Sequence, residues 1–248
     1  MLGPPMLASP ALRTLLRAPW TLRRLPGLTL WLDAQLSSLR QNSDGTISAA
    51  ADGDPVGYGQ DLSGYGNHPI QATAGFRPLL QLGANGINGL PCLLFDAVDD
   101  FLRVTFGAAL SQPVTVYVGC SFGSTAAYRY AVSRDAASDF SLYAEITTGY
   151  VAIVNGLTVT STTAASGVQM VSVVANGASS TIRRNGAQIA SGDSGTNTLS
   201  GVTVGASYVG TSPLGGKMFM LAVYAGAHSV AQQQLVEDYY KARGYWSS

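Results

Sequence analysis

The sequence predicts an all-β protein, a sandwich of two antiparallel sheets with an extended N-terminal arm and one C-terminal helix. The chain of 248 residues contains 29 Gly and only 11% charged residues. Helices use Glu and Lys heavily on their exposed faces, whereas strands and turns do not. Asn-Gly, which suits two-residue hairpin turns, occurs at 85–86, 88–89, 155–156, 176–177 and 185–186.

Short β-prone runs lie between these turns, at the spacing of roughly 8–12 residues that is typical of sandwiches and barrels. We expect strands at 28–32, 92–95, 101–105, 114–122, 141–146, 149–154, 157–162, 168–175, 180–184, 187–191, 202–206 and 217–224.

One helix is expected near the C-terminal end. Ser229 can cap a helix over 230–243, and Gly244 stands where that helix would stop. Leu235 and Tyr239, together with Val236, are expected on its buried face because residues three and four apart are neighbours on a helix.

Composition excludes several classes of protein. The formal net charge is zero, so the chain lacks the basic footprint of a general nucleic-acid binder. A hydrophobic content of 46% argues against disorder. The uncharged stretch 146–182 is rich in Thr, Ser and Gly and indicates strands and turns, with no membrane insertion. Cys92 and Cys120 are expected as buried free thiols, with a disulfide as the alternative.

The first 27 residues are interpreted as a docking arm before a domain at 28–248. The arm alternates basic and apolar side chains and holds no acid, with Arg13, Arg17, Trp20, Arg23 and Arg24 as the residues expected to dock. Arginine suits interfaces because its planar guanidinium pairs bidentately. The arm either wraps its own domain or docks on another subunit, and we favour the second because exposed Leu and Trp mark interfaces.

Several motifs resemble one family in the right order along the chain. The chain resembles the laminin-G-like, concanavalin A-like jelly-roll domains, in the version found in bacteriophage virion proteins. The resemblance covers roughly 28–248 and rests on Leu30-Trp-Leu-Asp-Ala34, Asp61-Leu-Ser-Gly-Tyr-Gly-Asn-His68, Phe95-Asp-Ala-Val-Asp-Asp-Phe-Leu102, Arg183-Arg-Asn-Gly186, Gly215-Gly-Lys-Met-Phe-Met-Leu-Ala-Val-Tyr224 and the final helix. Ala97 stands where the family has Gly.

The resemblance implies a two-sheet jelly roll, but this fold hosts lectins, hydrolases and purely structural proteins. From the phage-type motifs we expect a structural protein on the exterior of a virion, as a capsid decoration, minor capsid or tail-associated protein. Its partners would be major capsid or tail subunits and further copies of itself. The alternative is a secreted or surface module that binds carbohydrate on cell surfaces.

Catalytic constellations are weak in this sequence. A glycosidase needs two carboxylates beside the scissile bond, but Glu145 has no second Glu near it. Asp99 and Asp100 are adjacent, so on a strand they would point to opposite faces. His68 and His228 are expected in loops. We therefore expect a protein that is not an enzyme.

Two kinds of ligand site remain open. Oxygens of Asp61, Asn67, Asp96, Asp99 and Asp100 suit calcium, but Asp in such loops more often stabilises turns, so we expect no metal or cofactor and keep calcium as the alternative. Aromatic side chains can stack on sugars, and the candidates for glycan binding are Tyr65, Tyr143 and Tyr150.

Overall fold

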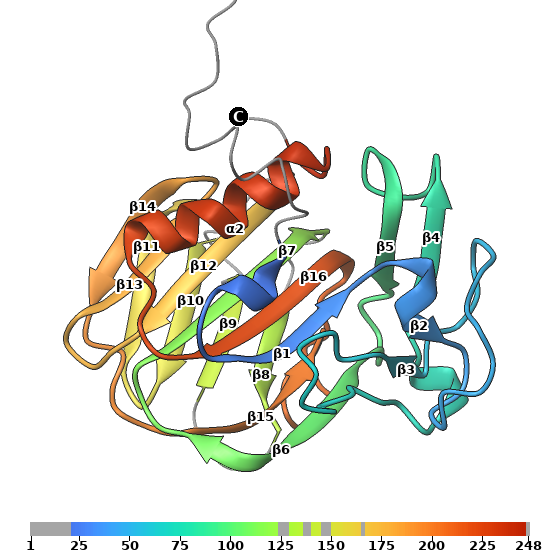
Figure 1. Cartoon of the computed structure of the whole chain (residues 1–248), viewed down its shortest axis with the longest axis horizontal. Helices are drawn as coiled ribbons and strands as arrows, with labels where there is room; N and C mark the ends of the chain where they lie inside the picture. The colour runs from blue at the N-terminus through green and yellow to red at the C-terminus, as the bar shows by residue number, and fades with distance from the viewer. Residues whose placement is uncertain (1–20, 124–128, 136–139, 145–149, 165–166, 247–248) are drawn as a thin grey trace, which may run out of the picture.

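Two antiparallel sheets pack face to face, as predicted (Figure 1). The structure, a computed structural model, describes residues 21–123, 129–135, 140–144, 150–164 and 167–246. In these residues the larger sheet has the order β14-β13-β12-β7-β16-β5-β4, and β1 pairs with β16 beside β5. Its strands are β1 (Leu28–Asp33), β4 (Leu79–Gly83), β5 (Gly89–Phe95), β7 (Val114–Phe122), β12 (Val168–Ala175), β13 (Ser180–Arg184), β14 (Ala187–Gly192) and β16 (Gly216–Ala225).

The smaller sheet has the order β11-β10-β9-β8-β15-β6 in the same described ranges. Its strands are β6 (Leu102–Leu110), β8 (Arg129–Arg134), β9 (Phe140–Ala144), β10 (Tyr150–Asn155), β11 (Thr158–Ala164) and β15 (Leu199–Val204). A short pair, β2 (Leu39–Arg40) and β3 (Tyr58–Gly59), and three 3₁₀ turns, Leu22–Arg24, Leu36–Ser38 and Ala74–Phe76, lie in the loops.

The central strands of the larger sheet are buried on both faces for most of their length. Along β7, Val116 and Val118 point into the core between the sheets, while Tyr117 points into a second apolar layer outside. This alternation follows from the two-residue period of a strand. Continuous apolar runs such as 114–118 therefore mark strands that are covered on both sides.

The second apolar layer is covered by α2 (Val230–Ala242), which crosses the outer face of the larger sheet (Figure 1). Ser229 and Gln232 form a reciprocal capping box at its start, so the predicted cap is confirmed. The predicted buried face was wrong in part: Leu235 and Tyr239 are only partly buried. The fully covered side chains are Gln233, Val236, Glu237 and Tyr240.

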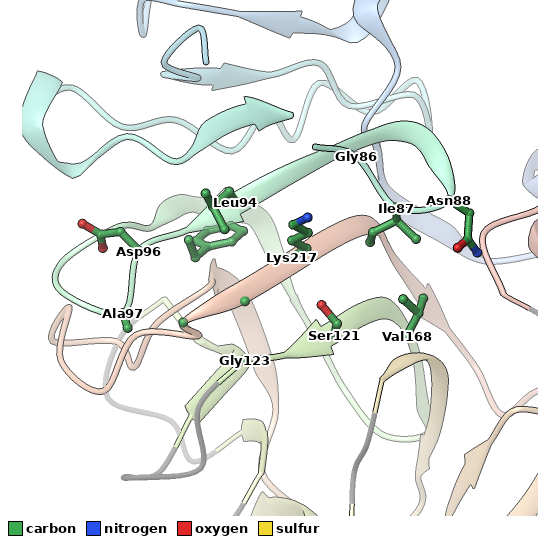
Figure 2. A pocket seen from close by; sticks show the side chains of 13 residues that line it. Gly86, Ile87, Asn88, Leu94, Asp96, Ala97, Ser121, Gly123, Val168 and Lys217 are labelled. Atoms are coloured by element: carbon green, nitrogen blue, oxygen red, sulfur yellow. The ribbon is translucent and has the colours of Figure 1, made fainter. Parts of the chain in front are cut away.

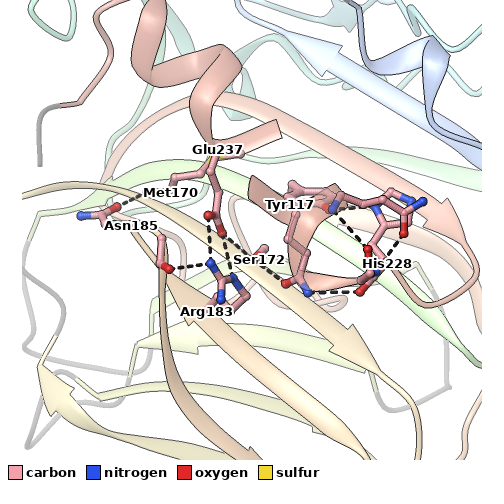
Figure 3. A network of polar contacts seen from close by, with 11 residues as sticks. Tyr117, Met170, Ser172, Arg183, Asn185, His228 and Glu237 are labelled. Carbon is pink, nitrogen blue, oxygen red and sulfur yellow. Dashed lines mark hydrogen bonds and ion pairs between the residues drawn. The ribbon is translucent and has the colours of Figure 1, made fainter. Parts of the chain in front are cut away.

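Two polar residues on that face explain the difference, because the sheet below offers them partners (Figure 3). Glu237 forms a buried ion pair with Arg183 at 3.3 Å, and Ser172 donates to both Gln233 and Glu237. His228, just before the helix, is buried with its Nδ1 2.7 Å from the hydroxyl of Tyr117. Burial lowers the pKa of His228. His228 lies in a loop, as predicted, and its contact with Tyr117 helps to hold that loop against the sheet.

Most predicted strands are confirmed, and three match residue for residue: 114–122, 168–175 and 180–184. Four strands were not predicted, namely β2, β3, β4 and β8. Of the Asn-Gly pairs, only Asn88-Gly89 and Asn185-Gly186 have both residues at positive φ among the described residues. The other three pairs also lie between strands, but in turns that do not require positive φ at Asn.

Cys92 and Cys120 are free and buried, as predicted. They face opposite sides of the larger sheet, Cys92 towards the layer under α2 and Cys120 towards the core between the sheets. Burial raises the pKa of the Cys92 thiol to about 11. Among the described residues, no helix is long and apolar enough to cross a membrane.

Candidate functional site

A cleft lies on the outer face of the larger sheet where α2 and the C-terminal segment no longer cover it. Its volume is about 650 Å³. Its floor is formed by the end of β5, the end of β7 and the start of β16, and the β4–β5 hairpin forms one wall (Figure 2). The lining residues are Gly86, Ile87, Asn88, Leu94, Phe95, Asp96, Ala97, Ser121, Gly123, Val168, Gly215, Gly216 and Lys217.

Lys217 lies in the middle of the cleft, between the hairpin at Gly86 and the end of β7 at Ser121 (Figure 2). Its ammonium donates to the carbonyl of Asn85 at 2.7 Å. Because an ammonium carries three donors, two remain for a ligand or for water. Lys217 therefore offers a positioned donor in the cleft.

The two ends of the cleft differ in chemistry. Asp96 lies at one end, and Asn88 and Val168 lie at the other (Figure 2). Oδ1 of Asp96 accepts from the backbone N–H groups of Val98 and Asp99, which fixes the carboxylate at the rim. The amide of Asn88 donates to the carbonyls of Gly244 and Tyr245, and this fastens the hairpin to the C-terminal segment.

Asp96, Asp99 and Asp100 belong to a turn between β5 and β6, which agrees with the loop expected between the predicted strands 92–95 and 101–105. One carboxylate oxygen from each of the three lies within 4.8 Å of the others, so the divergence that a strand would impose on Asp99 and Asp100 does not apply in this turn. Asp100 is buried and accepts from the N–H of Asp96 at 3.0 Å. Burial raises the pKa of Asp100 to about 6. The turn thus concentrates negative charge at one end of the cleft.

Asp61 does not join that group of carboxylates among the described residues. It is buried, and its oxygens accept from the N–H groups of Trp31, Ser63 and Asn67 and from the hydroxyl of Ser63. This is the turn-stabilising role that the sequence favoured for it. The five oxygen donors proposed for calcium are therefore not brought together as one site.

Tyr65 lies in the loop that Asp61 organises, and 75% of the residue is exposed. Arg23, another predicted site residue, donates to the carbonyl of Leu62 in the same loop. Arg24 is exposed beside Arg23. Arg13, Arg17 and Trp20 lie outside the described residues, and so do Glu145 and the side chains of Tyr143 and Tyr150.

The N-terminal segment is fastened to its own domain from Leu22 onwards. Leu22 and Leu25 are buried in the layer under α2. The hydroxyl of Tyr224 donates to the carbonyl of Leu22 at 3.0 Å, and the N–H of Ala225 donates to the carbonyl of Gly27 at 2.8 Å.

The sequence matches no protein-family model and no curated protein. Solved structures do resemble it. The binding domain of Paraclostridial mosquitocidal protein 1 has a TM-score of 0.58 at 10% identity, over 89% of this chain and 53% of that chain. Domain 4 of an extracellular arabinanase from Geobacillus stearothermophilus, in complex with arabinotriose, has a TM-score of 0.57 at 11% identity, over 85% of this chain and 98% of that one.

A sialidase from Trypanosoma rangeli has a TM-score of 0.54 at 8% identity, over 89% of this chain and 34% of the sialidase. The chain spans about half the length of the mosquitocidal structure and about a third of the length of the sialidase. At these identities the likeness establishes the fold. The fold is a β-sandwich, shared with the binding domain of the mosquitocidal protein and with the arabinanase domain that was solved with arabinotriose.

Proposed function

We propose that this chain is a non-enzymatic glycan-binding module and that the cleft around Lys217 holds the sugar. The observation that carries the proposal is one continuous cleft in which polar groups face apolar ones. Lys217, Asp96 and Ser121 supply the polar groups, and Leu94 and Val168 are among the apolar residues. A concave site with a few placed polar groups is the usual form of a small-ligand site.

The chemistry of the cleft suits a sugar ring. Sugar hydroxyls both donate and accept, so hydroxyls at different positions along a bound glycan can accept from the Lys217 ammonium and donate to the Asp96 carboxylate. The partly exposed apolar side chain of Leu94 can pack on the C–H face of the ring. The fold gives independent support, because domain 4 of the arabinanase was solved in complex with arabinotriose.

A binding role, rather than hydrolysis, is supported by the acids of the cleft. Glycoside hydrolysis uses a pair of carboxylates that flank the scissile bond. Asp96 is the one acid among the lining residues that the structure describes, and Lys217 lies farther along the cleft beyond Leu94 (Figure 2). Asp99 and Asp100 gather with Asp96 in one turn instead of facing it across a bound sugar.

A glycan array probed with the full-length chain tests this function. We expect binding to a subset of glycans, and we expect Lys217→Ala to reduce that binding at least about tenfold because a charge-assisted hydrogen bond is lost. Lys241→Ala is the matched control, since Lys241 lies on α2 outside the cleft. Equal loss in both variants, or no binding by wild-type protein, would overturn the proposal.

A second candidate function is display of this module on the exterior of a virion through the residues before Thr21. The observation that favours it is the fastening of Leu22 and Leu25 beside the exposed Arg23 and Arg24. Because these residues are packed against the sandwich, an arm that docks on a partner would hold the sandwich on that partner. Major capsid or tail subunits would be the partners, and other copies of the chain would lie around the same symmetry axis.

Co-sedimentation with purified particles that lack this protein tests the display. The full-length chain is expected to pellet with the particles, and a chain without residues 1–20 is expected to remain in the supernatant with an unchanged melting temperature. Pelleting of both chains, or of neither, would contradict anchoring by the arm. The deletion ends at residue 20 because Leu22 belongs to the folded core.

A further inference from the structure

We infer that the cleft around Lys217 selects neutral glycans and rejects acidic ones that carry carboxylate or sulfate groups. This inference rests on the proposed glycan binding and adds the substrate class of the same site. The observation behind it is the distribution of charged side chains in and around the cleft.

An exposed acid, Asp52, lies close enough to the one lysine of the cleft to interact with its charge. Asn85 accepts from the Lys217 ammonium through its carbonyl at 2.7 Å, and its side-chain amide donates to Oδ2 of Asp52 at 2.6 Å. Asp52 also accepts from the N–H of Leu82 at 2.7 Å. The negative charge of Asp52 therefore offsets part of the positive potential of Lys217. An anion in the cleft is attracted less strongly than it would be by an isolated ammonium.

The end of the cleft at Asp96 is strongly acidic. Three carboxylates, from Asp96, Asp99 and Asp100, lie within 4.8 Å of one another. A cation, Arg129, also lies near the cleft, because its guanidinium carbon is 3.8 Å from the position that a Cβ on the lining residue Gly215 would take. Arg129 donates to the carbonyl of Pro213 at 3.0 Å.

The sum of these charges is negative. Among the described residues in and beside the cleft, Lys217 and Arg129 supply two positive charges, while Asp52, Asp96, Asp99 and Asp100 supply four carboxylates. An acidic sugar that enters the cleft meets this surplus, whereas a neutral sugar does not. At separations of about 6 Å in a solvated cleft, each surplus charge changes affinity by roughly threefold.

The test compares glycans that share a backbone and differ in charge. The probes are fully methyl-esterified and de-esterified polygalacturonate, and N-acetyllactosamine with and without 6-sulfate, together with the neutral and acidic members of a glycan array. At 50 mM salt we expect each bound neutral glycan to bind about three- to tenfold more tightly than its acidic partner. At 0.5 M salt the ratio is expected to fall towards one because the charges are screened.

Two variants with the same change of net charge sharpen the test. Asp96→Asn keeps an oxygen that can accept from the N–H groups of Val98 and Asp99. It is expected to reduce the difference in affinity between neutral and acidic probes at low salt. Asp238→Asn changes an exposed aspartate of α2 outside the cleft and is expected to leave the gap unchanged.

The possible outcomes distinguish a failure of the neutral selectivity from a failure of the proposed glycan binding. Acidic probes that bind as tightly as neutral ones at 50 mM salt, with sensitivity to Lys217→Ala, would overturn the neutral selectivity and leave glycan binding intact. An equal effect of Asp96→Asn and Asp238→Asn would overturn the role given to the acidic turn. Absence of binding to every probe would overturn the glycan-binding function and the inference together.

Discussion

Tyr240 on α2 donates its hydroxyl to Oδ2 of Asp33 on β1 at 2.9 Å, and it accepts from Nε1 of Trp31 at 2.9 Å. Arg243 pairs with the same Asp33 oxygen at 2.6 Å. Asp33 is completely buried, so its charge depends on these two partners. The contact joins the first strand of the sandwich to its last helix, and it closes the apolar layer that ends at the cleft.

Tyr240→Phe is expected to destabilise the fold by about 1–3 kcal/mol, because a buried carboxylate oxygen and a buried indole N–H each lose a partner. Urea unfolding followed by circular dichroism measures the change. Tyr65→Phe, at an exposed loop tip, serves as the control and should alter the free energy of unfolding by less than about 0.5 kcal/mol. Equal stabilities of the two variants would show that the Asp33 contact is not structural.

Gln169→Met is expected to stabilise the protein. Gln169 on β12 is completely buried, and neither its side-chain oxygen nor its nitrogen has a hydrogen-bond partner. A buried unsatisfied amide costs about 1–3 kcal/mol, and Met fills a similar volume without that cost. Gln188→Met on the exposed part of β14 is the matched control. A lower melting temperature for Gln169→Met would show that the amide is satisfied in solution.

Ala97→Gly is expected to raise stability by about 1 kcal/mol. Ala97 has a φ of 70°, in the left-handed region that side chains with a Cβ avoid. It is also the position where the resembled family has Gly. Ala231→Gly, on the exposed face of α2, should destabilise by a similar amount because Gly weakens helices. Thermal unfolding of both variants checks the opposite signs, and a loss of stability for Ala97→Gly would contradict strain in this turn.

Asp100→Asn is expected to stabilise the protein at neutral pH but not at pH 4. Burial raises the pKa of Asp100 to about 6 from its usual 3.8, so the folded state holds this proton more tightly than the unfolded chain does. The protonated carboxyl therefore favours folding at low pH, and that contribution is lost as pH rises from about 4 to about 6.

The stability difference between Asp100→Asn and wild type should grow over the same interval to about 1–3 kcal/mol, because one pKa unit corresponds to about 1.4 kcal/mol. Urea unfolding at a series of pH values between 4 and 7.5 measures it. A difference that is constant with pH, or that shrinks as pH rises, would contradict a raised pKa in the folded state.

Strands with apolar residues on both faces could be predicted closely from sequence, because long runs of Val leave no other role for 114–122 and 168–175. The helix start at Ser229 was equally clear, since its cap is a local signal. β8 was missed because its six residues include Arg at both ends and Tyr beside one of them, and only pairing with β9 and β15 makes them a strand. The buried face of α2 was misjudged because Glu237 looks like a surface residue until Arg183 lies beneath it.

The cleft could not be predicted from sequence. Its walls come from separate strands and from a hairpin fastened by Asn88 to the C-terminal segment, and no local motif encodes that contact. Lys217 lies in the closing-strand motif of the resembled family and is the one charged residue of that apolar segment. A single charge in an apolar strand is a signal that could have marked it as a site residue. Asp96 was singled out for calcium, whereas its position at the rim of the cleft depends on the turn that gathers Asp99 and Asp100.

Titration calorimetry with the tightest-binding neutral oligosaccharide from the array, on wild type, Lys217→Ala and Lys241→Ala side by side, tests whether the cleft is the binding site. One site per chain is expected in wild type and in Lys241→Ala, with affinity at least about tenfold weaker in Lys217→Ala and unchanged melting temperatures in the absence of sugar. Undiminished binding by a folded Lys217→Ala variant would contradict glycan recognition in this cleft.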